Sequence, residues 1–377
     1  MPGFELIGKE EKKNLLDIFE KSNGVMFAHG FEKLRNNIFR VREFEKQLKK
    51  KFDTKECQVV SSGTAAIKVA LKAIGIKPGD EVITQSFNFI ATIEAILDCG
   101  AKPIITKIDD SLNMCPIDLE KRITSKTKAI IPVHMLGFSA NLKEIIKICK
   151  KCKIFMIEDN CEAVGAKYNK KYLGTIGDAG ILSFDHGKNI TTGEGGAILT
   201  NNKKIFLSAK EYHDHGHQLN PKFPRGMDTV KMAGFNYRMS ELNAAVGLAQ
   251  IKKINLILKE NKKRYLILNN IVSKKFKIRK CHINTTPSFD TFIFKVDNLE
   301  LRKKIVGLLK SKKIGTKNLP DAIKWHFASY WKHAISKKEI NRLEKSHNKL
   351  KKHIAIPILL KKNINAYKEV ANKIIEC

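Results

Sequence analysis

The sequence has no long apolar run. Its longest, residues 129–138, is interrupted by Pro132 and His134, whereas a transmembrane helix needs roughly 20 apolar residues in succession. The N-terminal segment is interrupted by the charged residues 10–13 and so lacks the apolar centre of a signal peptide. These two absences predict a cytoplasmic protein that is not inserted in a membrane.

Arginine is scarce for so basic a chain. Of the 70 basic residues only 10 are arginine, and the formal net charge is +32. Such a charge ordinarily points to nucleic acid or an anionic membrane as partner. Here, however, the lysines are spread from end to end, and no basic stretch is interleaved with stacking aromatics or resembles a recognition helix. We expect no nucleic-acid partner, although an anionic small-molecule substrate stays compatible with the charge.

The cysteines do not form a disulfide framework. Eight of them in 377 residues, in a chain that we expect to be cytoplasmic, are typical of free thiols. Cys149 and Cys152 make a single Cys-x-x-Cys at the end of a helical pattern, without the second pair of a zinc site. His213, His215 and His217 alternate in a polar loop but have no companion ligand motif. We therefore expect no metal.

Short β-branched segments alternate with helical ones from residue 56 onward, which is typical of an α/β domain with a largely parallel sheet. The predicted strands are residues 57–60, 81–84, 102–106, 129–133, 154–157, 181–184 and 197–200, and the predicted helices are residues 64–74, 90–98, 141–151 and 240–264. Short strands such as 292–296 and very basic helices follow. Because the chain exceeds one core of typical size, we predict a large domain over 1–254 and a smaller one over 255–377.

One lysine is distinguished by its surroundings. Lys188 lies between two predicted strands, beside the glycine-rich residues 191–196, which let the backbone approach a ligand. A lysine on such a loop can form a Schiff base with a carbonyl if burial or a neighbouring charge lowers its pKa. From this segment alone, a surface lysine in a hairpin turn is equally compatible.

Four other segments can hold parts of one cofactor. Residues 61–66 join a strand to a helix start, which either binds phosphate or is simply capped. Phe89 lies in the next such junction, where it either stacks on a planar cofactor or packs in the core. Asp159 ends an apolar strand at the edge where parallel sheets bind ligands, and it pairs either with a pyridinium nitrogen or with a structural cation. Asn236 and Arg238 open a later helix with donors suited to a phosphate. Their order along the chain predicts a pyridoxal phosphate site.

These blocks resemble the DegT/StrS type of sugar aminotransferases, which depend on pyridoxal phosphate and have fold type I. The matching blocks are residues 44–45, 62–66, 79–83, 131–137, 158–166, 183–184 with Lys188, 193–196 and 236–238. The resemblance implies an α/β large domain with a mostly parallel seven-stranded sheet and a smaller C-terminal α+β domain. It also implies a homodimer with shared active sites and a twofold interface.

The resemblance assigns a role to each site residue. Lys188 would be the Schiff-base lysine and proton carrier, Asp159 the partner of the pyridinium nitrogen, and Phe89 the ring stacker. The full cofactor set is Ser62, Gly63, Thr64, Ala65, Phe89, Asp159, Glu162, Ser183, Lys188 and Asn236, of which Asn236 reaches the cofactor phosphate of the partner. The substrate contacts would be His186, Glu194, His215, Arg225, Arg238 and His326.

Three positions depart from the family. Glu162 stands where many relatives carry Gln or His near the ring hydroxyl of the cofactor, so hydrogen bonding and charge differ there. Lys107 and Cys115 stand where relatives often have Asp. In a dehydratase branch of the family, histidine replaces the Schiff-base lysine. Lys188 at the aligned position therefore favours an aminotransferase.

The implied reaction has two halves. An amino acid, usually glutamate, gives its amine to the cofactor, and a keto sugar then accepts it. The loop segments 212–217 and 224–229, ahead of residues 234–236, resemble those of relatives that aminate an acidic octulosonate for lipopolysaccharide, so we predict 8-amino-3,8-dideoxy-manno-octulosonate as the product. Arg225 would suit the carboxylate of that acceptor, or equally the diphosphate of a 3- or 4-keto nucleotide sugar. A sugar dehydratase and a non-catalytic, cofactor-binding regulator are also compatible with these residues.

Overall fold

The central sheet has seven strands in the order β1-β9-β8-β5-β4-β2-β3 in the computed structural model, which describes residues 2–220 and 222–377. The strands are β1 (Glu56–Val60), β2 (Glu81–Gln85), β3 (Lys102–Thr106), β4 (Thr127–Ile131), β5 (Phe155–Asp159), β8 (Ala179–Ser183) and β9 (Gly196–Thr200). From β8 through β5, β4 and β2 to β3 all neighbours are parallel, and β9 is antiparallel to both β8 and β1. The predicted mostly parallel, seven-stranded sheet is confirmed.

Both faces of this sheet are buried, as expected where crossover helices cover a parallel sheet. In β9, Ile198 packs into the core that includes α4 and α8, whereas Ala197 and Leu199 on the opposite face pack into the core that includes α3. The covering helices are α3 (Arg40–Phe52), α4 (Gly63–Ala73), α5 (Ala91–Asp98), α6 (Pro116–Arg122), α7 (Leu142–Cys152) and α8 (Lys203–Tyr212). At the N-terminus, α1 (Pro2–Glu5) and α2 (Lys9–Ser22) precede them.

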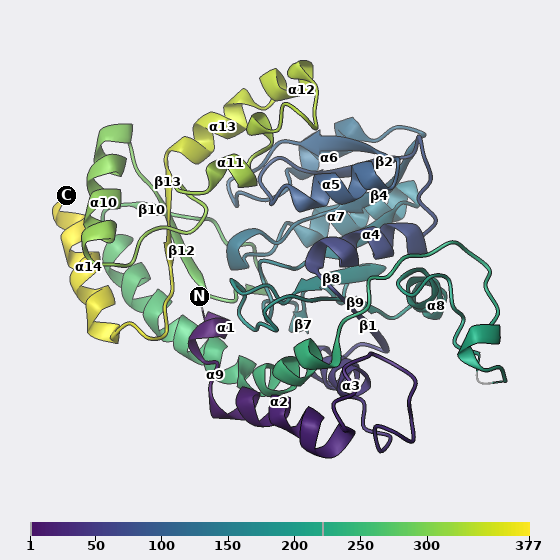
Figure 1. Cartoon of the computed structure of the whole chain (residues 1–377). Coiled ribbons are helices and arrows are strands. Elements are labelled where there is room, and N and C mark those ends of the chain that lie inside the picture. Colours follow the sequence, from purple (N-terminus) through teal and green to yellow (C-terminus); the bar gives the residue numbers. More distant parts are fainter. Residues whose placement is uncertain (1, 221) are drawn as a thin grey trace.

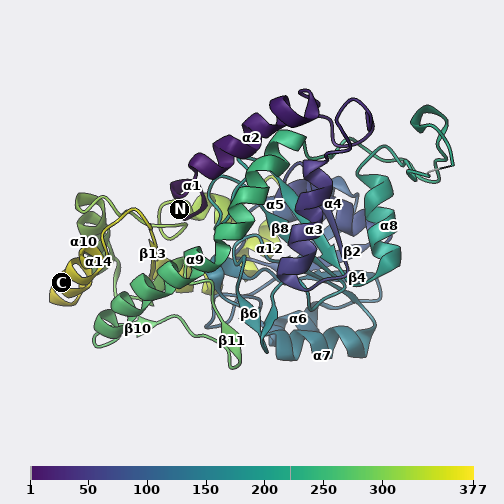
Figure 2. The same ribbon diagram turned by 90° about the horizontal axis from the view of Figure 1, so that it is seen from below.

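Helix α9 (Glu241–Val272) is longer than the sequence predicts. The predicted end at residue 264 is wrong because Tyr265, Leu268 and Val272 continue the helical spacing and pack into a second core. Figure 2 shows α9 running from α2 and α3 toward the C-terminal elements. The division into domains at residue 254/255 stays a proposal, and it would place the boundary inside α9.

The second core belongs to the C-terminal part of the chain, of which the small sheet and the helices over 299–311 and 364–376 gather at the left in Figure 1. Its sheet has the order β10-β12-β13. The elements of this part are β10 (Lys277–Ile278), β12 (Thr291–Lys295), α10 (Leu299–Ser311), α11 (Ile323–His326), α12 (Lys337–Arg342), α13 (Glu344–Lys351), β13 (His353–Pro357) and α14 (Ile364–Glu376). A further small sheet joins β11 (Thr285–Thr286) to β6 (Lys167–Tyr168) and β7 (Lys171–Tyr172).

The segment around α11 returns to the large sheet. Asn88 N donates to His326 O at 3.1 Å, and Ile90 N donates to Trp325 O at 3.1 Å. These bonds fix α11 against the junction between β2 and α5, which contains Phe89. A helix that is both long and apolar enough to cross a bilayer does not occur within residues 2–220 and 222–377.

Candidate active site

Lys188 lies in the connection between β8 and β9, near the carboxyl end of β8. The backbone of this connection is held by a bond from Phe184 N to Gly195 O at 2.8 Å. Gly193 has a φ of +83°, a left-handed conformation that favours glycine. The side chain of Lys188 is only 16% exposed, and its Nζ lies 2.5 Å from Glu162 Oε1. A surface lysine in a hairpin turn is thereby excluded.

The pair formed by Lys188 and Glu162 is electrostatically strong. Burial, the largest single effect, lowers the pKa of Lys188, but Glu162 together with Cys161 and Asp185 outweighs burial and raises that pKa. Burial alone would raise the pKa of Glu162, but Lys188 and then Lys317 hold it well below its usual range. The lowered pKa that was expected of a nucleophilic lysine is therefore not found here, because Glu162 favours the protonated amine.

Asp159 ends β5, and its carboxylate is buried and oriented by two donors. Thr92 Oγ1 donates to Oδ2 at 2.9 Å, and Cys161 N donates to Oδ1 at 3.2 Å. Neither donor is a cation, so the structural salt bridge considered from the sequence is not seen here. The carboxylate is held in one orientation at the edge of the sheet where ligands bind.

The start of α4 lies beside β8. Ser62 Oγ accepts a hydrogen bond from Ala65 N at 3.1 Å, so Ser62 caps the helix. A Cβ added to Gly63 would lie 2.8 Å from Ser183 Cβ, so only glycine lets the helix start approach this strand. The N-terminus of this 11-residue helix can then offer backbone N–H groups and its positive dipole to an anion.

Phe89 does not pack into the core, because its side chain is 44% exposed. Its ring centroid lies 5.2 Å from that of His326, with the two planes tilted by 45°. A large aromatic face that stays open beside a cavity is suited to stack on a planar ligand.

These groups meet in one cavity of about 130 Å³. It is lined by Ser62, Gly63, Thr64, Ile67, Phe89, Ala91, Thr92, Val133, Asp159, Cys161, Glu162, Ser183, Asp185, Lys188 and Glu194. The donor set fits pyridoxal phosphate: a helix start for the phosphate, a carboxylate for the ring nitrogen, a ring face and an amine. Glu162 Oε2 is buried here and accepts no hydrogen bond within the described residues, although Lys317 Nζ lies 3.5 Å away, so an acceptor for a ligand hydroxyl is also present.

Most of the predicted cofactor residues are gathered by the fold. Ser62, Gly63, Thr64, Phe89, Asp159, Glu162, Ser183 and Lys188 line the cavity. Ala65 is buried behind them. Asn236 is exposed in the loop before α9 and does not line the cavity of its own chain.

The predicted substrate residues divide into two groups. Glu194 lines the cavity, and His326 does not line it but lies against Phe89, which does. His186 is exposed and stacks on Phe4, with ring centroids 4.5 Å apart. His215 is exposed in the loop after α8, and Arg238 is paired with Asp214. The side chain of Arg225 lies outside the described part of the structure.

The histidine cluster does not converge. His213 is buried, with its Nε2 3.1 Å from Gln58 Nε2, whereas His217 faces Asp228 at 3.7 Å. No group of three or more His, Cys, Asp or Glu side chains within the described ranges has a geometry suited to a metal ion.

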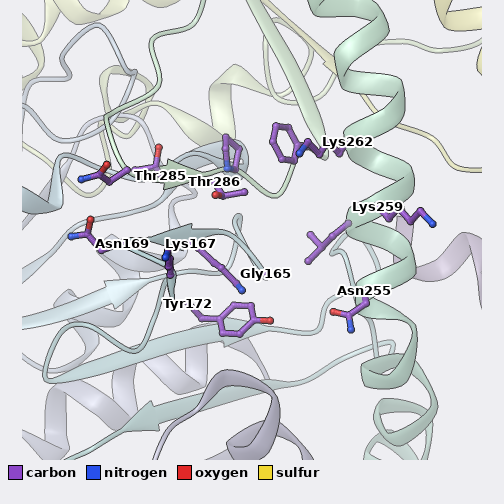
Figure 3. A pocket seen from close by; sticks show the side chains of 14 residues that line it. Gly165, Lys167, Asn169, Tyr172, Asn255, Lys259, Lys262, Thr285 and Thr286 are labelled. Carbon is purple, nitrogen blue, oxygen red and sulfur yellow. The ribbon is translucent and has the colours of Figure 1, made fainter.

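A larger hollow of about 910 Å³ lies elsewhere, between α9 and the sheet of β6, β7 and β11 (Figure 3). Its lining includes Lys167, Lys170, Lys259 and Lys262, but none of the predicted site residues. Lys259 extends away from Tyr172 in Figure 3, so the lysines do not converge on one point. The smaller cavity at Lys188 is therefore the candidate active site.

Three residues near the cavity were missed from the sequence. Thr92 lies at the start of α5, where a hydroxyl after a strand end is a detectable signal. Cys161 also lines the cavity, and no pattern in the sequence marks it as a site residue. Lys317, whose Nζ lies 3.5 Å from Glu162 Oε2, comes from the C-terminal part and is one of 60 lysines, so no local pattern marks it.

Comparison with known proteins agrees with this geometry. The DegT/DnrJ/EryC1/StrS aminotransferase family matches residues 32–375. GDP-perosamine synthase of Escherichia coli O157:H7 is 38% identical over 214 residues, 56% of this chain and 57% of the relative, so the match spans little more than half of that relative. An uncharacterized protein of Methanocaldococcus jannaschii is 32% identical over 321 residues, 82% of this chain and 80% of the relative.

The fold also matches solved structures. The aminotransferase of Psychrobacter cryohalolentis superimposes with a TM-score of 0.86 at 23% identity, covering 98% of this chain and 97% of that one. The α/β fold predicted from the sequence is thus confirmed. Since the family matches nearly the whole sequence, the chain belongs to the DegT/DnrJ/EryC1/StrS aminotransferase family.

Proposed function

We propose that this chain is a pyridoxal phosphate-dependent aminotransferase that moves an amine, preferably from L-glutamate, to a keto sugar. The observation that carries the proposal is that Lys188 and Asp159 line one cavity with the start of α4 and the open face of Phe89. The similarity to a GDP-perosamine synthase supports a sugar acceptor. The amino sugar would serve lipopolysaccharide or another surface polysaccharide.

Each residue has a separable task in this reaction. Pyridoxal phosphate, when bound, supplies an electron-accepting ring. Lys188 Nζ would accept the proton from one carbon and return it to the other in both half-reactions. Asp159 would hold the ring nitrogen protonated, and Phe89 would support the ring face. Gly63, Thr64 and Ser183 surround the place for the phosphate, where the positive end of the helix dipole favours an anion.

Two classes of keto sugar are candidates for the acceptor. The first candidate is an acidic octulosonate that is aminated at carbon 8. It is supported by the resemblance of the loop segments 212–217 and 224–229 to those of relatives that use this acceptor. The 38% identity to GDP-perosamine synthase supports a nucleotide-linked keto sugar as the second. The presence of Lys188 in the cavity, rather than a histidine, favours amine transfer over dehydration and over a purely regulatory role.

The acceptor is tested by incubating the enzyme and glutamate with 8-oxo-3,8-dideoxy-manno-octulosonate and with 3-keto and 4-keto nucleotide sugars in separate reactions. We expect 2-oxoglutarate, measured by a coupled assay, and an amino sugar, measured by mass spectrometry, with the octulosonate. Product with nucleotide sugars alone would reject the first candidate. Loss of a hydroxyl without amine transfer would indicate the dehydratase, and cofactor binding without any turnover would indicate the regulator.

The position of Asn236 supports a homodimer whose active sites are shared. Asn236 does not line the cavity of its own chain. Its loop is tied to residues 23–39 because Asp214 Oδ2 lies 2.7 Å from His29 Nε2. Phe31 and Phe235 on these segments are more than half exposed, and exposed apolar side chains of this size favour burial in an interface. In the proposed dimer, Asn236 contacts the cofactor phosphate held by the partner.

Mixed dimers test this sharing. A Lys188→Ala chain with one affinity tag is combined with an Asn236→Ala chain that carries another. If Asn236 acts across the interface, the mixed dimer regains one site with wild-type cofactor affinity, whereas Asn236→Ala alone binds the cofactor about tenfold more weakly. If the mixed dimer binds cofactor as weakly as Asn236→Ala alone, Asn236 serves its own chain and sharing is rejected.

The state of the cysteine thiols supports a proposed location for the protein in the cell. All eight cysteines are free in the structure, which supports a reducing compartment such as the cytoplasm. The sugar would then be aminated before its export to the cell surface.

A further inference from the structure

Four charged side chains form a buried row that alternates in sign. Lys188 Nζ lies 2.5 Å from Glu162 Oε1, and Glu162 Oε2 lies 3.5 Å from Lys317 Nζ. Lys317 Nζ lies 2.7 Å from Asp290 Oδ2. The side chains of Glu162, Lys317 and Asp290 are all less than one tenth exposed. Each charge in the row therefore depends on its neighbours rather than on solvent.

The outer half of the row is built by the C-terminal part of the chain. Lys317 is fixed by a bond from its N–H to Ala355 O in β13 at 2.9 Å. Asp290 precedes β12, and its Oδ1 accepts from Ser288 Oγ at 2.7 Å. Gly137 joins the two halves, because its N–H donates to Glu162 O at 2.8 Å and an added Cβ would lie 2.5 Å from Asp290 Oδ1. The side chain of Lys317 thus reaches Glu162 from a fixed backbone.

Few other ionisable groups face this row. Cys161 and Asp185 act electrostatically on Lys188, and His326 acts on Glu162. Asp159 faces Cys161, and Asp290 interacts electrostatically with the buried Arg279. Lys317 is the cation on the side of Glu162 away from Lys188. Without Lys317, the row would contain two carboxylates and one cation.

We propose that Lys317 is a positioning residue that acts on Lys188 through Glu162. It holds Glu162 so that Oε1 faces Lys188 Nζ, and its charge offsets that of the carboxylate, which eases release of the proton from the Lys188 nitrogen. This inference rests on the proposed function, because Lys188 must be the lysine that carries the proton. It assigns a task to the Glu162 carboxylate, which stands where many relatives carry Gln or His.

The sign of the effect follows from the charges. Removing the cation of Lys317 leaves Glu162 as a less compensated anion, and an anion near Lys188 favours its protonated form. Removing the anion of Asp290 has the opposite sign, because the Lys317 charge then acts more strongly on Glu162. The two changes should therefore move the titration of the Lys188 nitrogen in opposite directions.

The test is the absorbance of the cofactor-loaded enzyme over a pH series, whose midpoint reports the proton on the Lys188 nitrogen. We expect Lys317→Met to raise this midpoint by about one pH unit, a tenfold change in proton affinity. Asp290→Asn should lower it by about half a unit. Lys317→Arg, which keeps the charge, should stay close to the wild type. Thermal unfolding and circular dichroism of each variant check the fold.

Each outcome decides a separate point. If Lys317→Met binds the cofactor with an unchanged midpoint, the proposal is overturned. If Lys317→Met does not fold, Asp290→Asn decides the question. A lowered pH midpoint in Asp290→Asn, with most of that shift lost when Glu162→Gln is added, supports action through Glu162. An unchanged midpoint in Asp290→Asn rejects the proposal. If the wild type shows no cofactor band that depends on Lys188, the proposed function itself fails, which is a distinguishable result.

Discussion

Replacing Lys188 with alanine should reduce kcat by on the order of 10⁴-fold or more, because the variant has neither the amine that joins the cofactor nor the group that moves the proton. Steady-state release of 2-oxoglutarate measures this loss. The visible absorbance band that depends on the lysine should disappear as well. The remaining lysine near Glu162 is not a substitute, because Lys317 Nζ is bound to Asp290 and lies on the far side of the carboxylate.

Lys188→Arg is the matched control for this variant. Arginine keeps a positive charge beside Glu162, so the buried carboxylate stays paired and the fold is preserved, but the guanidinium neither joins a carbonyl nor gives up its proton. Both variants should therefore be equally inactive, although Lys188→Arg should unfold at a temperature nearer to that of the wild type. Adding methylamine to Lys188→Ala should restore part of the activity. Turnover within tenfold of the wild type in either variant would refute the role of Lys188.

The central sheet and the part of the site formed by Lys188 and Asp159 were predictable because the sequence patterns that indicate them are local. Each parallel strand with its helix forms a short repeating unit, so alternation along the sequence gives the topology. Lys188 and Asp159 follow strand ends, and strand ends of a parallel sheet meet at one edge. The sequence could therefore place both side chains in one cavity without knowledge of the packing.

The part of the site formed by Lys317 and Asp290 depends on contacts between residues that are far apart in the sequence. Lys317 reaches Glu162, and Asp290 reaches Lys317, only because the C-terminal part docks beside Gly137. The length of α9 was also missed, since no glycine or proline ends its pattern and tertiary packing decides where it stops. For Arg238, a sequence pattern gives a candidate donor but not its partner, which is the buried Asp214.

Asp159→Asn should lower kcat by about 10²- to 10³-fold while the enzyme still binds the cofactor. The amide has the shape of the carboxylate but no charge, so it cannot hold a proton on the ring nitrogen, and the ring becomes a weaker electron acceptor. Phosphate and ring contacts at α4 and Phe89 are unchanged. We therefore expect kcat to fall much more than the affinity for pyridoxal phosphate, measured by fluorescence titration. A kcat within threefold of the wild type would contradict this role.

Thr92→Val separates the charge of Asp159 from its orientation. The Thr92 hydroxyl donates to Asp159 Oδ2 at 2.9 Å, whereas Cys161 N holds the other oxygen. Valine has a similar shape, so the carboxylate keeps its charge and one of its two donors. The expected loss in kcat is about tenfold, the size of one hydrogen bond to a charged group. Because Thr92 acts on the ring only through the carboxylate, Thr92→Val should add almost nothing to the loss in an Asp159→Asn background.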